Sequence, residues 1–171
     1  MSVAQISFDP SVAGNFNDLT PQFRPGTVYE HPTTGRQYRY VRHDNGAAVA
    51  SANGGAAYWS DYANAVVSSD KTDNQMGATI PAGVAGIYQG VVTDRYFTWL
   101  VIKGSYTTML AAADANGAVG NRIFAPASDA DLRVRSEADS SVAAAEIPAT
   151  EIGRQLAAGA ADAALVLLNI P

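Results

Sequence analysis

The sequence contains no cysteine and only two lysines, and charged residues make up 16% of its 171 positions. The lack of cysteine excludes a disulfide framework, a thiolate nucleophile, an iron–sulfur cluster and a cysteine-bound zinc site. Ordinary globular chains carry about 25% charged residues, so the chain is poor in charge. Its net charge of −5 disfavours nucleic-acid binding, which usually comes with a basic excess. We therefore predict no nucleic-acid partner.

Long uncharged apolar runs are also missing. No stretch approaches the ~18 residues that a membrane span requires. The first residues carry no basic start, and Asp9 and Pro10 interrupt any apolar run, unlike a signal peptide. We therefore expect no membrane partner, and synthesis in a cytoplasm without export by this route.

Residues that carry chemistry are scarce as well. Only His31 and His43 are available as an imidazole base, and no Gly-x-Ser-x-Gly elbow accompanies them. The two histidines do not form a helical pair that would clamp a metal. Loop carboxylates such as Asp129 and Asp131 do not fit the twelve-residue calcium loop. The sequence predicts a protein that is not an enzyme, with no catalytic residue, no cofactor and no metal site.

The first part of the chain is punctuated by proline at positions 10, 21, 25 and 32. Proline fixes its own φ and pushes the preceding residue toward extended conformations. We therefore predict an extended N-terminal arm over residues 1–34 and a body over residues 35–171. Aromatic residues recur along this arm at Phe8, Phe16, Phe23 and Tyr29. They are predicted to be anchors, either on the chain's own body or on a neighbouring molecule.

From residue 35 the pattern changes to a period of two, which is typical of a strand. Tyr38, Tyr40 and Arg42 fall on one face of this strand, and Arg39 and Val41 fall on the other. Further strands are predicted over residues 56–60, 63–67, 87–92, 96–102, 105–110, 120–124 and 163–170.

The segment over residues 96–102 is apolar on both faces apart from Thr98, so it is predicted to be central. Alanine-rich segments near the C-terminus favour helix by propensity. However, Pro148 and Gly153 interrupt them, and no helical apolar stripe survives. About ten short strands predict an all-β fold, with a small β-barrel or β-sandwich as the body.

Four arginines stand around the boundary between arm and body, at Arg24, Arg36, Arg39 and Arg42. Interleaved tyrosines would suit a nucleic-acid surface. The acidic net charge and the scarcity of lysine instead favour pairing with carboxylates, either at a protein interface or within the chain. These arginines, with the arm aromatics, are the predicted partner-binding residues.

The C-terminal part resembles the end of tailed-phage capsid decoration (cement) proteins. The resemblance is carried by Ile-Gly-Arg-Gln-Leu-Ala-Ala at residues 152–158, Ala-Asp-Ala at 161–163 and Leu-Val-Leu-Leu-Asn at 165–169, and more loosely by residues 35–50. The resemblance implies a small β-barrel or β-sandwich on the outer surface of the virion head, usually as a homotrimer. It implies the major capsid protein as partner, and neither enzymatic activity nor a cofactor. The long arm departs from the simplest members of the family.

The leading hypothesis is thus a non-enzymatic virion protein that stabilises contacts between capsid subunits. One alternative is a tail, neck or fibre-attachment component, which would follow a different symmetry in the particle. The other is a small-ligand or carbohydrate-binding β-barrel, or a hydrolase built on one. In that case Tyr58, Trp59 and Tyr62 would form an aromatic platform for a sugar.

Overall fold

The structure of the chain is a computed structural model, and it describes residues 10, 17–44, 51–70, 83–109, 119, 122–124, 135–136, 151–156 and 164–170. These residues contain strands and no helix, which confirms the predicted all-β class. The strands are β1 (Val28–Glu30), β2 (Gln37–His43), β3 (Ala56–Asp61), β4 (Val66–Ser68), β5 (Val84–Tyr88), β6 (Phe97–Met109), β7 (Arg122–Phe124), β8 (Arg135–Ser136), β9 (Glu151–Gln155) and β10 (Ala164–Asn169).

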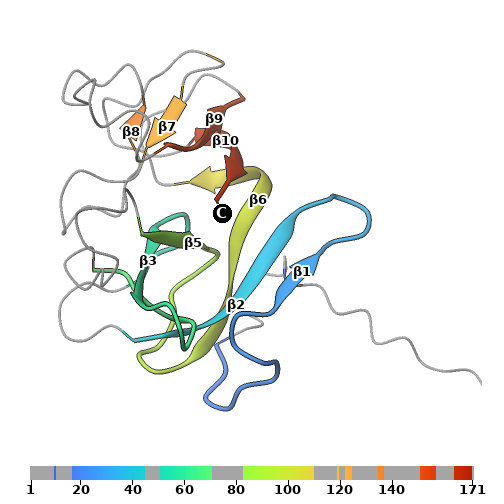
Figure 1. Cartoon of the computed structure of the whole chain (residues 1–171). Coiled ribbons are helices and arrows are strands. Elements are labelled where there is room, and N and C mark those ends of the chain that lie inside the picture. Colours follow the sequence, from blue (N-terminus) through green and yellow to red (C-terminus); the bar gives the residue numbers. More distant parts are fainter. Residues whose placement is uncertain are drawn as a thin grey trace, which may run out of the picture.

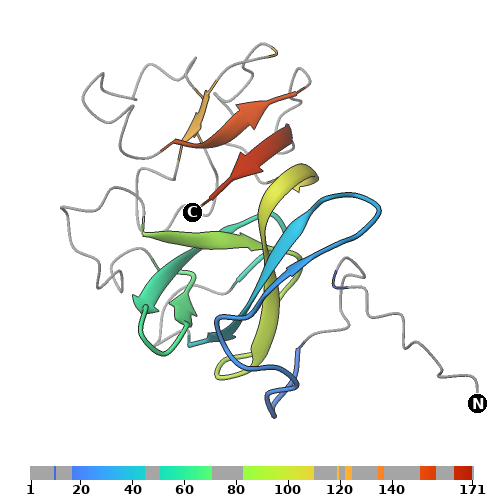
Figure 2. The same cartoon turned by 45° about the vertical axis from the view of Figure 1, so that its right-hand side comes forward.

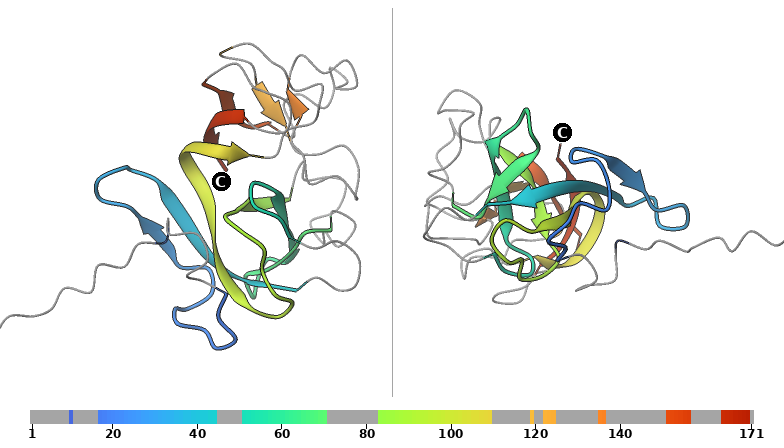
Figure 3. Two further views of the ribbon diagram at one scale, coloured as in Figure 1. Left: turned by 180° about the vertical axis from the view of Figure 1, so that it is seen from behind. Right: turned by 90° about the horizontal axis from the view of Figure 1, so that it is seen from below.

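One sheet contains all these strands, in the order β1-β2-β4-β3-β5-β6-β10-β9-β7-β8. An additional pairing of β2 with β6 closes the segment from β2 to β6 into a small barrel (Figure 1). The remaining strands β7–β10 continue from the second half of β6 and lie above the barrel in that view. The β1–β2 hairpin projects beside the barrel, as the turned view in Figure 2 shows. The two views in Figure 3 show the same arrangement from behind and from below.

Strand β6 holds the sheet together because it pairs with β5, β2 and β10. Its predicted central position is therefore confirmed. The prediction that the strand ends at residues 103–104 and a new strand starts at 105 was wrong. Gly104 adopts a φ of 100°, so the chain bends there without leaving the ladder. A Cβ at Gly104 would lie 2.9 Å from Cγ of Arg36, which also explains the glycine.

Two other predicted strands have different bounds. Residues 63–65 belong to the turn before β4, because Asp61 accepts hydrogen bonds from the backbone and side chain of Asn64 and Ala65 has a φ of 53°. Strand β5 begins at Val84 and ends at Tyr88, rather than spanning 87–92.

Both faces of the barrel wall are buried. One apolar cluster contains Tyr38 and Tyr40 together with Trp99, and a second contains Val41 with Leu100. This division confirms the alternation predicted for β2. Tyr88 of the second group also meets a side chain from a strand that is not its neighbour: Nδ1 of His43 on β2 lies 2.9 Å from the hydroxyl oxygen of Tyr88 on β5. Such contacts are expected for residues that face the interior of a small barrel.

The predicted division at residue 34 falls within the turn of the β1–β2 hairpin. The amide of Gly35 donates to the carbonyl of His31, and the amide of His31 donates to the carbonyl of Arg36. Residues 28–30 of the predicted arm therefore form a strand of the sheet.

Candidate functional site

Residues 17–27, here called the clasp, lie against one end of the barrel. The backbones of Asp18 and Phe97 exchange two hydrogen bonds of 3.1 and 2.8 Å. The side-chain amide of Asn17 donates to the hydroxyl of Thr93 at 2.8 Å and accepts from its backbone amide at 2.9 Å. The arm was predicted to dock either on the chain's own body or on a neighbouring molecule. The described residues 17–27 dock on the chain's own barrel. Phe8 and Phe16 lie outside the described residues.

Aromatic rings fix the clasp on the barrel. Phe23 meets Tyr40 and Trp99 edge-on, with ring centroids 5.4 and 5.3 Å apart. Tyr29 of β1 meets Trp99 at 6.3 Å, and Phe97 stacks on Tyr40 at 5.8 Å. The backbone amide of the residue before Phe23 donates to the Tyr40 hydroxyl at 3.1 Å, while burial raises the pKa of Tyr40. Phe23 and Tyr29 thus act as intramolecular anchors.

Apolar side chains nevertheless remain exposed in this region. Leu19 is 68% exposed, Val28 is 50% exposed and Phe23 is 36% exposed. Arg24 is also exposed, and its backbone carbonyl accepts the hydroxyl of Thr27 at 2.7 Å. The clasp and β1 therefore present both apolar and cationic groups to solvent, which suits an interface with another macromolecule.

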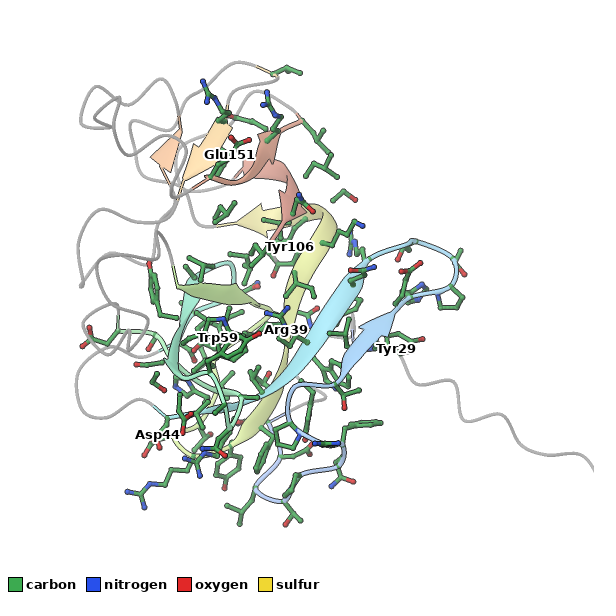
Figure 4. The ribbon with its side chains drawn as sticks, viewed as in Figure 1. Tyr29, Arg39, Asp44, Trp59, Tyr106 and Glu151 are labelled. Atoms are coloured by element: carbon green, nitrogen blue, oxygen red, sulfur yellow. The ribbon has the colours of Figure 1, made fainter. Side chains whose placement is uncertain are left out.

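The three arginines around β2 lie in three different environments. Arg39 lies 5.3 Å from the ring centroid of Trp59 and donates from Nη1 to the carbonyl of Ala85 at 3.3 Å (Figure 4). Burial lowers the pKa of Arg39. Arg42 instead pairs with Asp44 at 3.2 Å, and Arg36 packs beside Gly104. The sheet does not bring these three side chains together into one basic stripe.

The proposed aromatic platform does not form. Tyr58 and Trp59 are buried, at 1% and 6% exposure, and Trp59 carries the Arg39 guanidinium on its ring. Only Tyr62 is largely exposed, and it meets Trp59 edge-on rather than in one plane. The geometry therefore gives no support to stacking of a sugar on these three rings.

Both histidines make hydrogen-bond contacts within the chain. Nδ1 of His31 accepts the backbone amides of Thr33 and Thr34 in the β1–β2 turn, each at 3.2 Å. His43 is fully buried, and burial lowers its pKa although the charges of nearby aspartates oppose the shift. Within the described parts of the chain, no group of three or more histidine, cysteine, aspartate or glutamate side chains is arranged to hold a metal ion.

A hollow of about 740 Å³ lies beside the sheet where β6, β10 and β9 run together. It is bordered by Gly35, Lys103, Gly104, Glu151, Gly153, Arg154, Leu167, Leu168 and Asn169. None of these residues was predicted to bind a partner. Their positions on four separate segments of the sequence explain why, because strand pairing alone brings them together.

Comparisons with known proteins place no constraint on this site. No protein-family model matches the chain, and no curated protein and no solved structure matches it either. The ranges of the chain described by the structure include no helix with the length and hydropathy needed to cross a membrane.

Proposed function

We propose that the chain is a non-enzymatic structural protein of a tailed-phage virion, namely a capsid decoration or cement protein. It is made in the host cytoplasm, binds the outer surface of the head as a homotrimer, and stabilises contacts between major capsid subunits. The sequence resemblance suggests this family, and the all-β barrel is the architecture that such a role implies. The observation that carries the proposed mode of binding is the outer edge of β1.

Strand β1 is at one end of the sheet order, and among the described residues no strand pairs with its outer edge. The amide of Tyr40 donates to the carbonyl of Thr27, and the amide of His31 donates to that of Arg36. In an antiparallel ladder, bonded and non-bonded residues alternate. Thr27 and His31 bond to β2, and they are separated by an even number of positions. Val28 and Glu30, which alternate with them, therefore direct their backbone amides and carbonyls outward.

This edge can accept one more strand. Main-chain hydrogen bonds to an edge provide affinity, while side chains beside the added strand provide specificity. The half-exposed Val28 side chain and the exposed clasp residues Leu19 and Phe23 offer apolar contacts in the same part of the chain. An extended segment of a capsid subunit is the proposed occupant. Many copies on a closed shell would then gain avidity.

The substitution Val28→Pro tests this mode of binding. It removes the outward amide at position 28 without removing a hydrogen bond to β2, and proline is tolerated at the edge of a sheet. Val28→Ala is the matched control, because it changes the side chain but keeps the amide. Deletion of residues 1–34 is a less specific test, since it removes β1 itself. Purified variants are added to heads that lack the chain, and bound protein is measured by co-sedimentation.

We expect Val28→Pro to lose at least tenfold in head binding, while Val28→Ala stays within a factor of about three. Both variants should unfold at similar urea concentrations. Equal binding by both would refute β1 as the docking edge. Failure of the unmodified chain to bind heads, with binding to tails instead, would favour the tail or neck alternative.

A further inference from the structure

His43, the last residue of β2, is a titratable group buried at one end of the barrel. Its side chain is fully buried, and its Nδ1 lies 2.9 Å from the Tyr88 hydroxyl oxygen. Burial raises the pKa of Tyr88, so β5 offers the imidazole a neutral phenol rather than an anion. Nε2 of His43 is also buried and has no hydrogen-bond partner in the described part of the chain. A protonated imidazole carries hydrogen on both nitrogens, so its Nε2–H would be a buried donor without an acceptor.

The charged groups around His43 lie near the surface at the same end of the barrel. Asp44 follows it in the chain, and Asp94 lies in the turn before β6. The charges of both aspartates favour a protonated ring, but burial has the larger effect and lowers the pKa of His43. The side chains of Asp44 and Asp94 are 37% and 51% exposed, and they pair with Arg42 and Arg95. An imidazolium would therefore be better solvated if this end of the barrel opened toward water.

The turn before β6 is bonded to the end of β2 at His43. The His43 amide donates to the carbonyl of Tyr96 at 2.8 Å. This bond lies just beyond Arg42 and Phe97, the last pair of the ladder between β2 and β6. Arg95 in the same turn has a φ of 64°, a left-handed conformation that is unfavourable for a residue with a side chain. Displacement of the turn would thus leave the ladder intact and relieve an unfavourable backbone conformation.

The clasp is bonded to the same turn. The Asn17 side chain exchanges two hydrogen bonds with Thr93, and the backbone of Asp18 exchanges two with that of Phe97. Displacement of the turn would break the bonds to Thr93 and disturb those at Phe97, where the turn ends. Such a local opening involves fewer contacts than global unfolding, so it has a lower free-energy cost.

Asp18 is the titratable group on the clasp side of this contact. Its Oδ2 is buried without a hydrogen-bond partner in the described residues, and burial raises the pKa of its carboxyl. Protonation of Asp18 therefore favours docking of the clasp as the pH falls, which is opposite to the effect of His43. Asp18 remains partly exposed, whereas His43 is fully buried. Because the burial penalty is larger for the fully buried group, the net effect of acid follows His43.

We propose that His43 is an acid-sensitive switch for the clasp: protonation of its ring displaces the turn before β6 and releases residues 17–27 from the barrel. A solvated histidine titrates near pH 6.5, and the buried ring titrates lower. Docking is therefore strongest above pH 6.5 and weakens as the pH falls toward the lowered pKa of His43. Release uncovers the rings of Tyr40 and Trp99, which Phe23 contacts in the docked state. The switch involves only the chain's own residues, so it does not depend on the proposed function.

The test is an NMR titration of the full chain between about pH 8 and about pH 5. The amides of Asp18 and Gln22 report on the clasp, because both donate hydrogen bonds to groups of the barrel. The amide of Leu100 reports on the barrel, because Leu100 lies in the ladder between β2 and β6. The ring signals of His43 report its protonation in the same samples.

Two variants assign the effect to one histidine. His43→Gln replaces the ring by a polar side chain that does not ionise. His31→Gln is the matched control, because His31 is the other histidine of the sequence and lies in the β1–β2 turn.

We expect the ratio of docked to released clasp to fall by up to about tenfold per pH unit below pH 6.5, in step with protonation of His43. The Leu100 amide should remain native throughout. His31→Gln should behave like the unmodified chain, and His43→Gln should keep the clasp docked at about pH 5.

Three results would each overturn the proposal: a clasp that stays docked while the His43 ring titrates, release that persists in His43→Gln, or loss of the native Leu100 signal together with the clasp signals. If His43→Gln did not fold, the two titration curves of the unmodified chain would still decide, because the proposal requires ring and clasp to follow one curve.

Discussion

Replacing Phe23 by alanine should release the clasp and destabilise the barrel. A fully buried phenylalanine costs about 3–5 kcal/mol when it is replaced by alanine. Phe23 is 36% exposed, and it makes two edge-to-face contacts, with Tyr40 and Trp99. Such a ring pair contributes about 0.5–1.5 kcal/mol beyond its buried area. Scaled to the buried part of the ring, the expected loss in free energy of unfolding is about 2 kcal/mol.

Urea unfolding followed by tryptophan fluorescence measures this loss, since the Trp99 ring contacts the Phe23 ring edge-on. For a chain of this length, the melting temperature should fall by about 4–8 °C. Leu19→Ala is the matched control in the same segment, because Leu19 is 68% exposed and should change stability by at most about 0.5 kcal/mol. If Phe23→Ala and Leu19→Ala were equally stable, the clasp would not be held on the barrel.

Two further predictions concern the barrel itself. A Cβ at Gly86 would lie 2.6 Å from Cβ of Leu100, so Gly86→Ala should destabilise the fold by about 1–3 kcal/mol. A Cβ at Gly90 would meet nothing within 4 Å, so Gly90→Ala is the control and should be nearly neutral in the same urea titration. Equal stability of these two variants would contradict the close packing of β5 on β6. Burial lowers the pKa of His43 below 6.5, so the folded chain favours the neutral imidazole. The free energy of unfolding should therefore be highest above pH 6.5. It should fall as the pH drops toward the lowered pKa of His43, by at most about 1.4 kcal/mol per pH unit. An NMR titration of the folded chain that gave His43 an unshifted or raised pKa would refute its burial.

The sequence contained enough local information to predict strands, faces and the central position of one segment. The alternation around Tyr38 and Tyr40 and the doubly apolar residues 97–102 of β6 depend only on neighbours in the chain. The errors arose where tertiary packing decides the local structure. Gly104 was interpreted as the end of a strand, but its positive φ bends β6 from one set of partners to another. No local pattern distinguishes these two uses of glycine.

The interaction surfaces were predicted less completely than the fold. Phe23 and Tyr29 were identified as anchors from their spacing in a proline-rich segment, and both indeed pack on aromatic rings. The hollow beside β6, β10 and β9 was missed because the residues that border it, such as Lys103, Gly153 and Leu168, are far apart in the sequence. Only the register of these three strands brings them together, and that register depends on pairing between distant segments.

The central claim is that the chain decorates the outside of a phage head. Quantitative mass spectrometry of purified particles, combined with a cryo-electron microscopy map, tests this claim most directly. We expect hundreds of copies per particle, in a simple ratio to the major capsid protein, with density at three-fold or quasi-three-fold positions on the outer surface of the shell. A few copies in a ring at the tail or neck, or no copies in the particle, would contradict it.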